Sequence, residues 1–120
     1  MKLPDGLFKV ILENINDAVY FVNKERRILY WNKAAENLTG FKSEDVVGKF
    51  CHDNILRHVD AEGNELCLKE CPLSYAMKYD SPTKAKVFFH HKDGHRVPVV
   101  VMTTPIKNIK GEIVGAAELF

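Results

Sequence analysis

The placement of β-forming segments most constrains the fold, because they gather at the two ends of the chain. Near the start, short apolar runs at 18–22 and 28–31 flank a polar turn, which is the pattern of a β-hairpin. Near the end, longer β-rich segments at 84–91, 96–106 and 113–120 are joined by turns that contain glycine. Strands at both ends with helices between them predict an α+β fold with one antiparallel sheet.

Helical signals occupy most of the remaining chain. Apolar residues between positions 7 and 15 recur at helical spacing and predict an N-terminal helix with one face to bury. Asn32 is the predicted N-cap of a helix that ends at Gly40. A further helix is expected through 66–79, and Pro72 suits its first turn better than its interior.

The composition is that of one soluble globular domain. Hydrophobic residues make up 46% of the 120 residues and charged residues 28%, which argues against disorder. We divide the chain into an N-terminal flanking helix, residues 1–16, and one domain, residues 17–120. No apolar run approaches the roughly 20 residues that cross a bilayer, and the start has no signal-peptide pattern, so we expect a cytoplasmic domain.

Several short motifs follow one another in a characteristic order. They are DAVYFV at 17–22, ILYWNKAAE at 28–36, LTGF at 38–41, VGK at 47–49, HKDGHRVPV at 91–99 and GEIVG at 111–115. In this order and spacing they resemble the PAS family of bacterial sensory domains over nearly the whole chain. The resemblance implies a five-stranded antiparallel sheet with short helices covering one face and a cavity for a small ligand or cofactor. It also implies dimerisation through the N-terminal helix and an output domain outside this chain.

Apolar side chains on the expected inward faces would line such a cavity. A pocket of this kind would suit a small, partly apolar ligand, whereas plain core packing is the other interpretation of the same residues. The candidates are Tyr20, Phe21, Leu38, Tyr75, Met77, Val99 and Val101.

All three cysteines and two of the five histidines lie between positions 51 and 71. Thiolate and imidazole are the usual ligands of zinc and of iron centres. A candidate four-ligand set is Cys51, His58, Cys67 and Cys71. Helical spacing would place the sulfurs of Cys67 and Cys71 on one side, and a reversible disulfide is a related redox variant. Because free cysteine is also commonly buried, simple packing of the thiols stays open as an alternative.

Other cofactors have weaker support. Residues 48–51 (GKFC) resemble the start of the flavin-adduct motif of light-sensing PAS domains, but the polar residues that follow in that motif are missing, and Glu118 stands near the expected last-strand glutamine. Haem would need an axial histidine such as His52 or His58, and no haem-attachment motif occurs. No nucleophile elbow, phosphate-binding glycine loop or zinc-protease motif is present, so we expect no catalytic activity.

These features predict a sensory module that binds a small ligand, a metal ion or a redox centre. Binding would shift a conformational equilibrium and pass the change to an output domain of histidine kinase or diguanylate cyclase type. A ligand-free dimerisation or protein-interaction module is the alternative.

The expected partners follow from the resemblance and from the charge. We expect a homodimer formed through the apolar stripe of the N-terminal helix, which comprises Leu7, Phe8, Ile11, Leu12 and Ile15. A covalently linked output domain is the second expected partner. The formal net charge is +1 and no basic stripe occurs, so we expect neither nucleic acid nor direct membrane contact.

Overall fold

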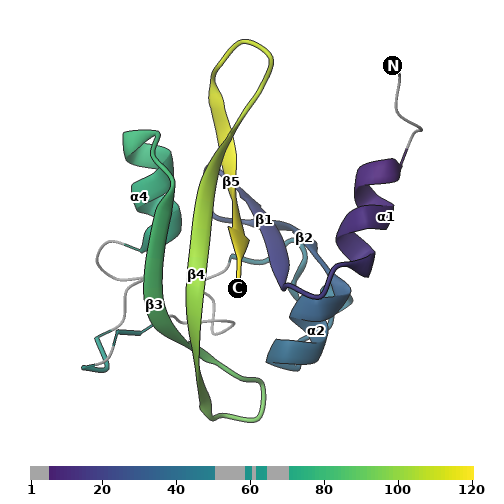
Figure 1. Ribbon diagram of the computed structural model, residues 1–120, viewed down its shortest axis with the longest axis vertical. Coiled ribbons are helices and arrows are strands. Elements are labelled where there is room, and N and C mark those ends of the chain that lie inside the picture. Colours follow the sequence, from purple (N-terminus) through teal and green to yellow (C-terminus); the bar gives the residue numbers. More distant parts are fainter. Residues whose placement is uncertain (1–5, 51–58, 61, 65–70) are drawn as a thin grey trace.

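Five antiparallel strands form the frame of the molecule, and the computed structural model in Figure 1 describes residues 6–50, 59–60, 62–64 and 71–120. The helices are α1 (Leu7–Asn14), α2 (Lys33–Thr39), α3 (Ser43–Val46) and α4 (Pro72–Tyr79). The strands are β1 (Val19–Asn23), β2 (Ile28–Trp31), β3 (Thr83–His90), β4 (Arg96–Lys107) and β5 (Ile113–Leu119). They form one sheet in the order β2-β1-β5-β4-β3, which confirms the predicted fold.

The last strand lies in the centre of the sheet, between β1 and β4. Glu118 of β5 is opposite Tyr20 on one side and opposite Thr103 on the other. Backbone hydrogen bonds between Ala18 and Phe120, at 3.0 and 2.9 Å, continue the β1–β5 pairing beyond the strand ends. Residues directly opposite one another project from the same face, so Tyr20, Glu118 and Thr103 share one face of the sheet.

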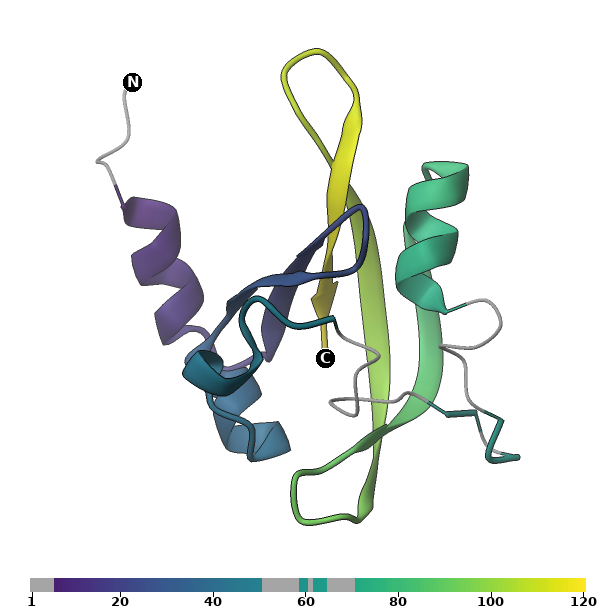
Figure 2. The same ribbon diagram turned by 180° about the vertical axis from the view of Figure 1, so that it is seen from behind.

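Helix α4 covers the half of the sheet that contains β3, β4 and β5, as the view from behind in Figure 2 shows. Pro72 occupies its first turn as predicted, and the backbone N–H of Ser74 donates to the sulfur of Cys71, the N-cap. The described part of the predicted 66–79 helix therefore begins at Pro72, while residues 65–70 lie outside the described part of the chain.

The side chain of Asn32 connects α1, β1 and α2 by hydrogen bonds. Its Oδ1 accepts from the N–H of Ala35, which confirms the predicted N-cap of α2, and also from the N–H of Val19 at 3.0 Å. Its Nδ2 donates to the carbonyls of Leu12 and Asp17 at 2.9 and 3.0 Å. One fully buried amide thus holds the end of α1, the start of β1 and the start of α2 in fixed relative positions.

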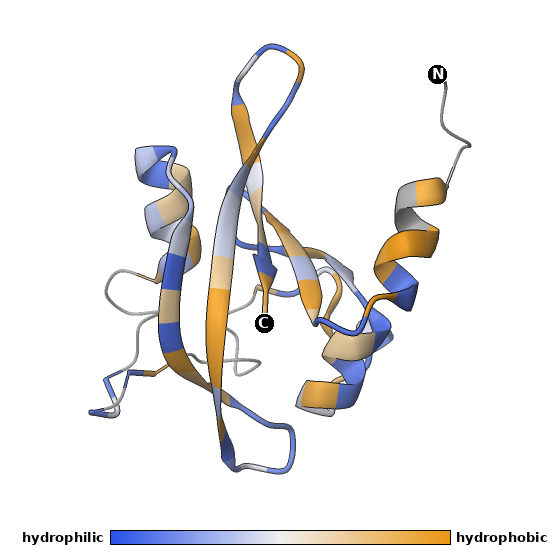
Figure 3. Cartoon of the chain, viewed as in Figure 1, coloured by the Kyte–Doolittle hydropathy of each residue, from blue (hydrophilic) through white to orange (hydrophobic). Residues whose placement is uncertain are grey.

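The core lies between the inner face of the sheet and the helices. Its largest fully buried side chains include Trp31, Tyr20 and Phe89. The rings of Tyr20 and Trp31 have centroids 5.4 Å apart, and Phe120 packs edge-on against both Tyr20 and Phe89. Hydropathy colours in Figure 3 show apolar residues along the lower half of β4 and along β1.

The N-terminal helix α1 packs against its own domain. It contacts α2, and Glu13 accepts a hydrogen bond from the hydroxyl of Tyr30 at 2.9 Å. Leu7, Leu12 and Ile15 of the predicted apolar stripe are half-buried, whereas Ile11 remains 46% exposed and the side chain of Phe8 lies outside what is described. Among the described residues, no helix combines the length and apolar character needed to traverse a bilayer.

Candidate functional site

A row of polar side chains crosses the inner face of the sheet from β1 through β5 to β4. The hydroxyl of Tyr20 donates to Oε1 of Glu118 at 2.9 Å, and the hydroxyl of Thr103 donates to Oε2 at 3.2 Å. All three residues are 0% exposed. Burying a carboxyl group is costly unless hydrogen bonds replace those lost from water, and the two hydroxyls supply such bonds.

Strand β3 adds one more hydroxyl to this row. Thr83 is directly opposite Thr103, and its Oγ1 is shielded from solvent without a hydrogen-bond partner among the described residues. A buried polar atom left unpaired costs about 1–3 kcal/mol. Such an atom calls for a specific reason, for example a bound water or ligand. We refer to Tyr20, Glu118, Thr103 and Thr83 together as the polar row.

Sequence reasoning missed the role of the polar row. The sequence pattern indicated Glu118 only as a departure from a flavin motif, and Tyr20 only as cavity lining or plain core. The available signal was the position of Glu118, because strand alternation places it on the same face as Ala116, and Ala116 belongs to the buried core. A charged residue at an inward position of an otherwise apolar strand is a functional candidate.

Part of the predicted cavity lining lies beside the polar row. Val101 is fully buried on the inner face of β4, and Val99 on the same face packs against the core. Met77 reaches that core from α4. These three residues therefore lie on the inner face of the sheet or pack against the core that covers it.

The other predicted lining residues lie elsewhere. Phe21 points to the opposite face from Tyr20, and its ring packs against Tyr30 with centroids 5.3 Å apart. Tyr75 is 40% exposed on α4 and packs against the ring of Tyr79. Leu38 borders an open pocket near the N-terminal helix. The structure therefore does not bring Phe21, Tyr75 and Leu38 together with Val99 and Val101.

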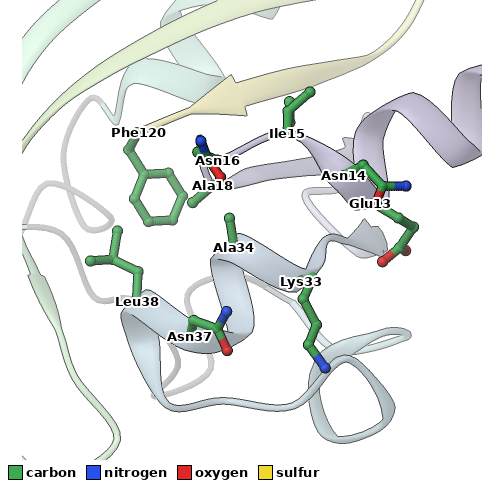
Figure 4. A pocket seen from close by; sticks show the side chains of 10 residues that line it. All are labelled: Glu13, Asn14, Ile15, Asn16, Ala18, Lys33, Ala34, Asn37, Leu38 and Phe120. Atoms are coloured by element: carbon green, nitrogen blue, oxygen red, sulfur yellow. The ribbon is translucent and has the colours of Figure 1, made fainter.

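That open pocket, of about 480 Å³, lies between the end of α1, helix α2 and the last residue (Figure 4). Its lining comprises Glu13, Asn14, Ile15, Asn16, Ala18, Lys33, Ala34, Asn37, Leu38 and Phe120. The side chains of Ala34, Leu38 and Phe120 point toward one another across it. Because the ring of Phe120 also packs against Tyr20, one side chain borders both the pocket and the polar row.

Of the four candidate metal ligands, only Cys71 lies in the described part of the chain. The described residues exclude Cys51, His58 and Cys67. Cys71 is 3% exposed, and its sulfur lies 3.4 Å from Nη1 of Arg26 and 3.3 Å from the hydroxyl of Ser74. Within the described ranges no group of three metal-binding side chains occurs, so the four-ligand set stays a prediction.

Comparison with known families agrees with this architecture. The family profile described as PAS fold matches residues 6–117. This chain belongs to the PAS family. The resemblance found in the sequence motifs is therefore confirmed, and PAS domains are regulatory sensory modules of signalling proteins such as histidine kinases. No curated protein matches the sequence.

Solved structures share the PAS fold at low sequence identity. A PAS domain from Colwellia psychrerythraea has a TM-score of 0.77 and 22% identity, covering 93% of this chain and 90% of that one. The PAS domain of the histidine kinase ThkA has a TM-score of 0.63 and 22% identity, covering 88% of this chain and 97% of that one. A ligand and DNA complex of Vibrio cholera VqmA has a TM-score of 0.74 and 18% identity, covering 98% of this chain and 50% of that one.

The VqmA complex corrects the partners expected from the sequence. VqmA carries the same fold and binds DNA, so excluding nucleic acid because this chain lacks a basic stripe was wrong. The charge argument covers only the chain given, which spans about half of VqmA (50%). The exclusion of nucleic acid is therefore withdrawn, and no comparison confirms the expected homodimer through α1 or the linked output domain.

Proposed function

We propose that this PAS domain is a cytoplasmic sensory module that binds a small polar ligand against the inner face of its sheet. Ligand binding would be relayed to an output domain of histidine kinase or diguanylate cyclase type in a longer signalling protein. The observation that carries the proposal is the fully buried carboxyl group of Glu118, held between the hydroxyls of Tyr20 and Thr103.

The polar row favours a ligand with hydrogen-bond donors. Carboxylate oxygens accept hydrogen bonds and do not donate them, so a ligand that carries donors matches Glu118 better than one that carries only acceptors. The buried hydroxyl of Thr83 offers another donor and acceptor at the β3 end of the row. The apolar neighbours Val99 and Val101 would contact the hydrocarbon part of the ligand. An amide, amine or hydroxyl compound with a small apolar body meets these requirements.

The position of Glu118 offers a route for the signal. Its strand β5 is hydrogen-bonded to both β1 and β4, so a change at Glu118 acts on both halves of the sheet. A ligand that prefers one arrangement of these strands shifts the population toward that arrangement. The relay therefore requires no bond making.

A thermal-shift screen of the purified chain tests the proposal. The panel would contain small amides, amines and hydroxy acids, each also measured with the Glu118→Gln and Glu112→Gln variants. We expect at least one compound to raise the melting temperature of the wild type and of Glu112→Gln, whose substitution lies in an exposed turn, but not of Glu118→Gln. Stabilisation that persists fully in Glu118→Gln would contradict the proposal.

A metal or redox centre is the second candidate, favoured by the fixed position of the Cys71 sulfur between Ser74 and Arg26. Zinc, iron or a reversible thiol pair would draw its other ligands from Cys51, His58 and Cys67. Elemental analysis of anaerobically purified protein should then show bound metal that is lost in Cys67→Ser with Cys71→Ser. A metal-free, colourless protein whose thiols remain reduced in air would support the ligand-free interaction module instead.

A further inference from the structure

A second groove lies outside the core, between α4 and the turn that joins β1 to β2. It has a volume of about 370 Å³ and is lined by Lys24, Ser74, Met77, Lys78 and Ile113. Figure 2 shows the turn beside α4, and the hydrogen bond from Arg26 of this turn to Cys71 at the start of α4 holds the two elements together. The groove shares no residue with the polar row.

Positive charge dominates this groove. Lys24 comes from the turn and Lys78 from α4, and neither forms an ion pair among the described residues. Nζ of Lys78 lies 5.2 Å from the centroid of the Tyr79 ring. Neither Glu25 nor Glu112, the acidic residues next to the lining in sequence, is part of the lining. Like charges that share a groove without a carboxylate favour an anion between them.

Each lysine alone has an ordinary structural explanation. Lys78 lies in the last turn of α4, where a cation interacts favourably with the helix dipole. Lys24 lies in a polar turn. These explanations do not account for the two ammonium groups flanking one groove together with a hydroxyl, Ser74, and an apolar wall of Met77 and Ile113.

We propose that this groove binds a small phosphate monoester with an apolar substituent. A phosphate group carries nearly two negative charges at neutral pH and three strong acceptor oxygens, which match the two lysines and the hydroxyl of Ser74. The apolar substituent would lie against Met77 and Ile113. Because α4 packs on β3, β4 and β5, an anion held here contacts the helix that covers the polar row.

Titration of the isotope-labelled chain with phenyl phosphate, followed by backbone amide shifts in NMR, tests this proposal. We expect saturable shifts centred on residues 24, 74, 77, 78 and 113. Inorganic phosphate should bind at the same residues about fivefold more weakly because it lacks the apolar ring. Benzyl alcohol, which keeps the ring without the charge, should produce no saturable shifts there.

Two double variants separate the groove from general surface charge. Lys24→Gln with Lys78→Gln should weaken phenyl phosphate binding at least about fivefold. Lys42→Gln with Lys110→Gln removes two exposed lysines outside the lining and should leave the affinity unchanged. Equal weakening in both variants, or shifts that spread over the surface without saturating, would overturn the proposal. Since all four positions are solvent-exposed, every variant should remain folded.

Discussion

The inner face of the sheet contains buried polar side chains, whereas the outer face contains exposed apolar ones. On the inner face, Glu118 and Thr103 are 0% exposed, whereas on the outer face Val100 and Met102 are 49% and 47% exposed. Exposed apolar residues are common on protein surfaces, but a buried carboxyl group is rare. The comparison teaches that the buried polar residues inside, not the exposed apolar residues outside, are the unusual feature of the sheet, and the proposed ligand site rests on them.

The largest expected effect comes from the apolar part of the inner face. Phe89→Ala should lower the free energy of unfolding by about 3–5 kcal/mol, because it leaves a cavity in the core. Met102→Ala on the outer face should change it by less than about 0.5 kcal/mol. Urea denaturation of both variants measures the difference. Similar losses would show that a partner or another segment covers the outer face.

Removing the buried carboxyl group should have the next largest effect. Glu118→Ala leaves the hydroxyls of Tyr20 and Thr103 without their acceptor, so we expect a loss of about 2–3 kcal/mol in urea denaturation. Glu118→Gln keeps the shape and one acceptor oxygen and should lose about 1 kcal/mol. If the alanine variant were the more stable of the two, the hydrogen bonds of Glu118 to Tyr20 and Thr103 would not stabilise the fold.

Neighbouring threonines on β4 give a sharper test of the two faces. Thr103→Val removes the inward hydroxyl that donates to Glu118 and should cost about 1 kcal/mol. Thr104→Val makes the same chemical change on the exposed outer face and should cost close to nothing. Equal effects of the two substitutions in chemical denaturation would remove the distinction between the faces.

The smallest effect concerns Tyr30 on the outer side of β2. Burial, then the hydrogen bond to Glu13 and the charge of its carboxylate, raise the pKa of Tyr30 from 10.0 to about 12. Tyr30 therefore ionises first in the unfolded chain as the pH rises, so its contribution to stability should be constant below pH 10.0 and fall between 10.0 and about 12. Ultraviolet titration of tyrosinate measures the pKa, and Tyr30→Phe should flatten this part of the stability curve.

In Glu13→Gln the pKa of Tyr30 should move back toward 10.0 but not reach it, because the burial of the Tyr30 ring remains.

Local structure was predictable because it depends on neighbours in sequence. The N-cap at Asn32, the stop at Gly40 and the turn through Asp93 and Gly94 all use residues with specific backbone or capping preferences. The strand boundaries agree with the predicted segments for the same reason.

The site depends on register, which the sequence does not encode locally. Tyr20 and Glu118 are 98 positions apart and meet only because β5 lies beside β1. The sequence also did not indicate to which face of the sheet Phe21 points. Residues 18–22 are apolar at every position, so they show no alternation between a buried and an exposed face.

The central place of β5 also constrains how the molecule is made. Val19 pairs with Leu119, so β1 has only β2 as a partner until the ribosome has released the far end of the domain. An isolated two-stranded hairpin is marginally stable in water. The β1 edge that pairs with β5 in the folded domain must therefore stay unpaired through most of synthesis, and such long-range pairing favours slow folding.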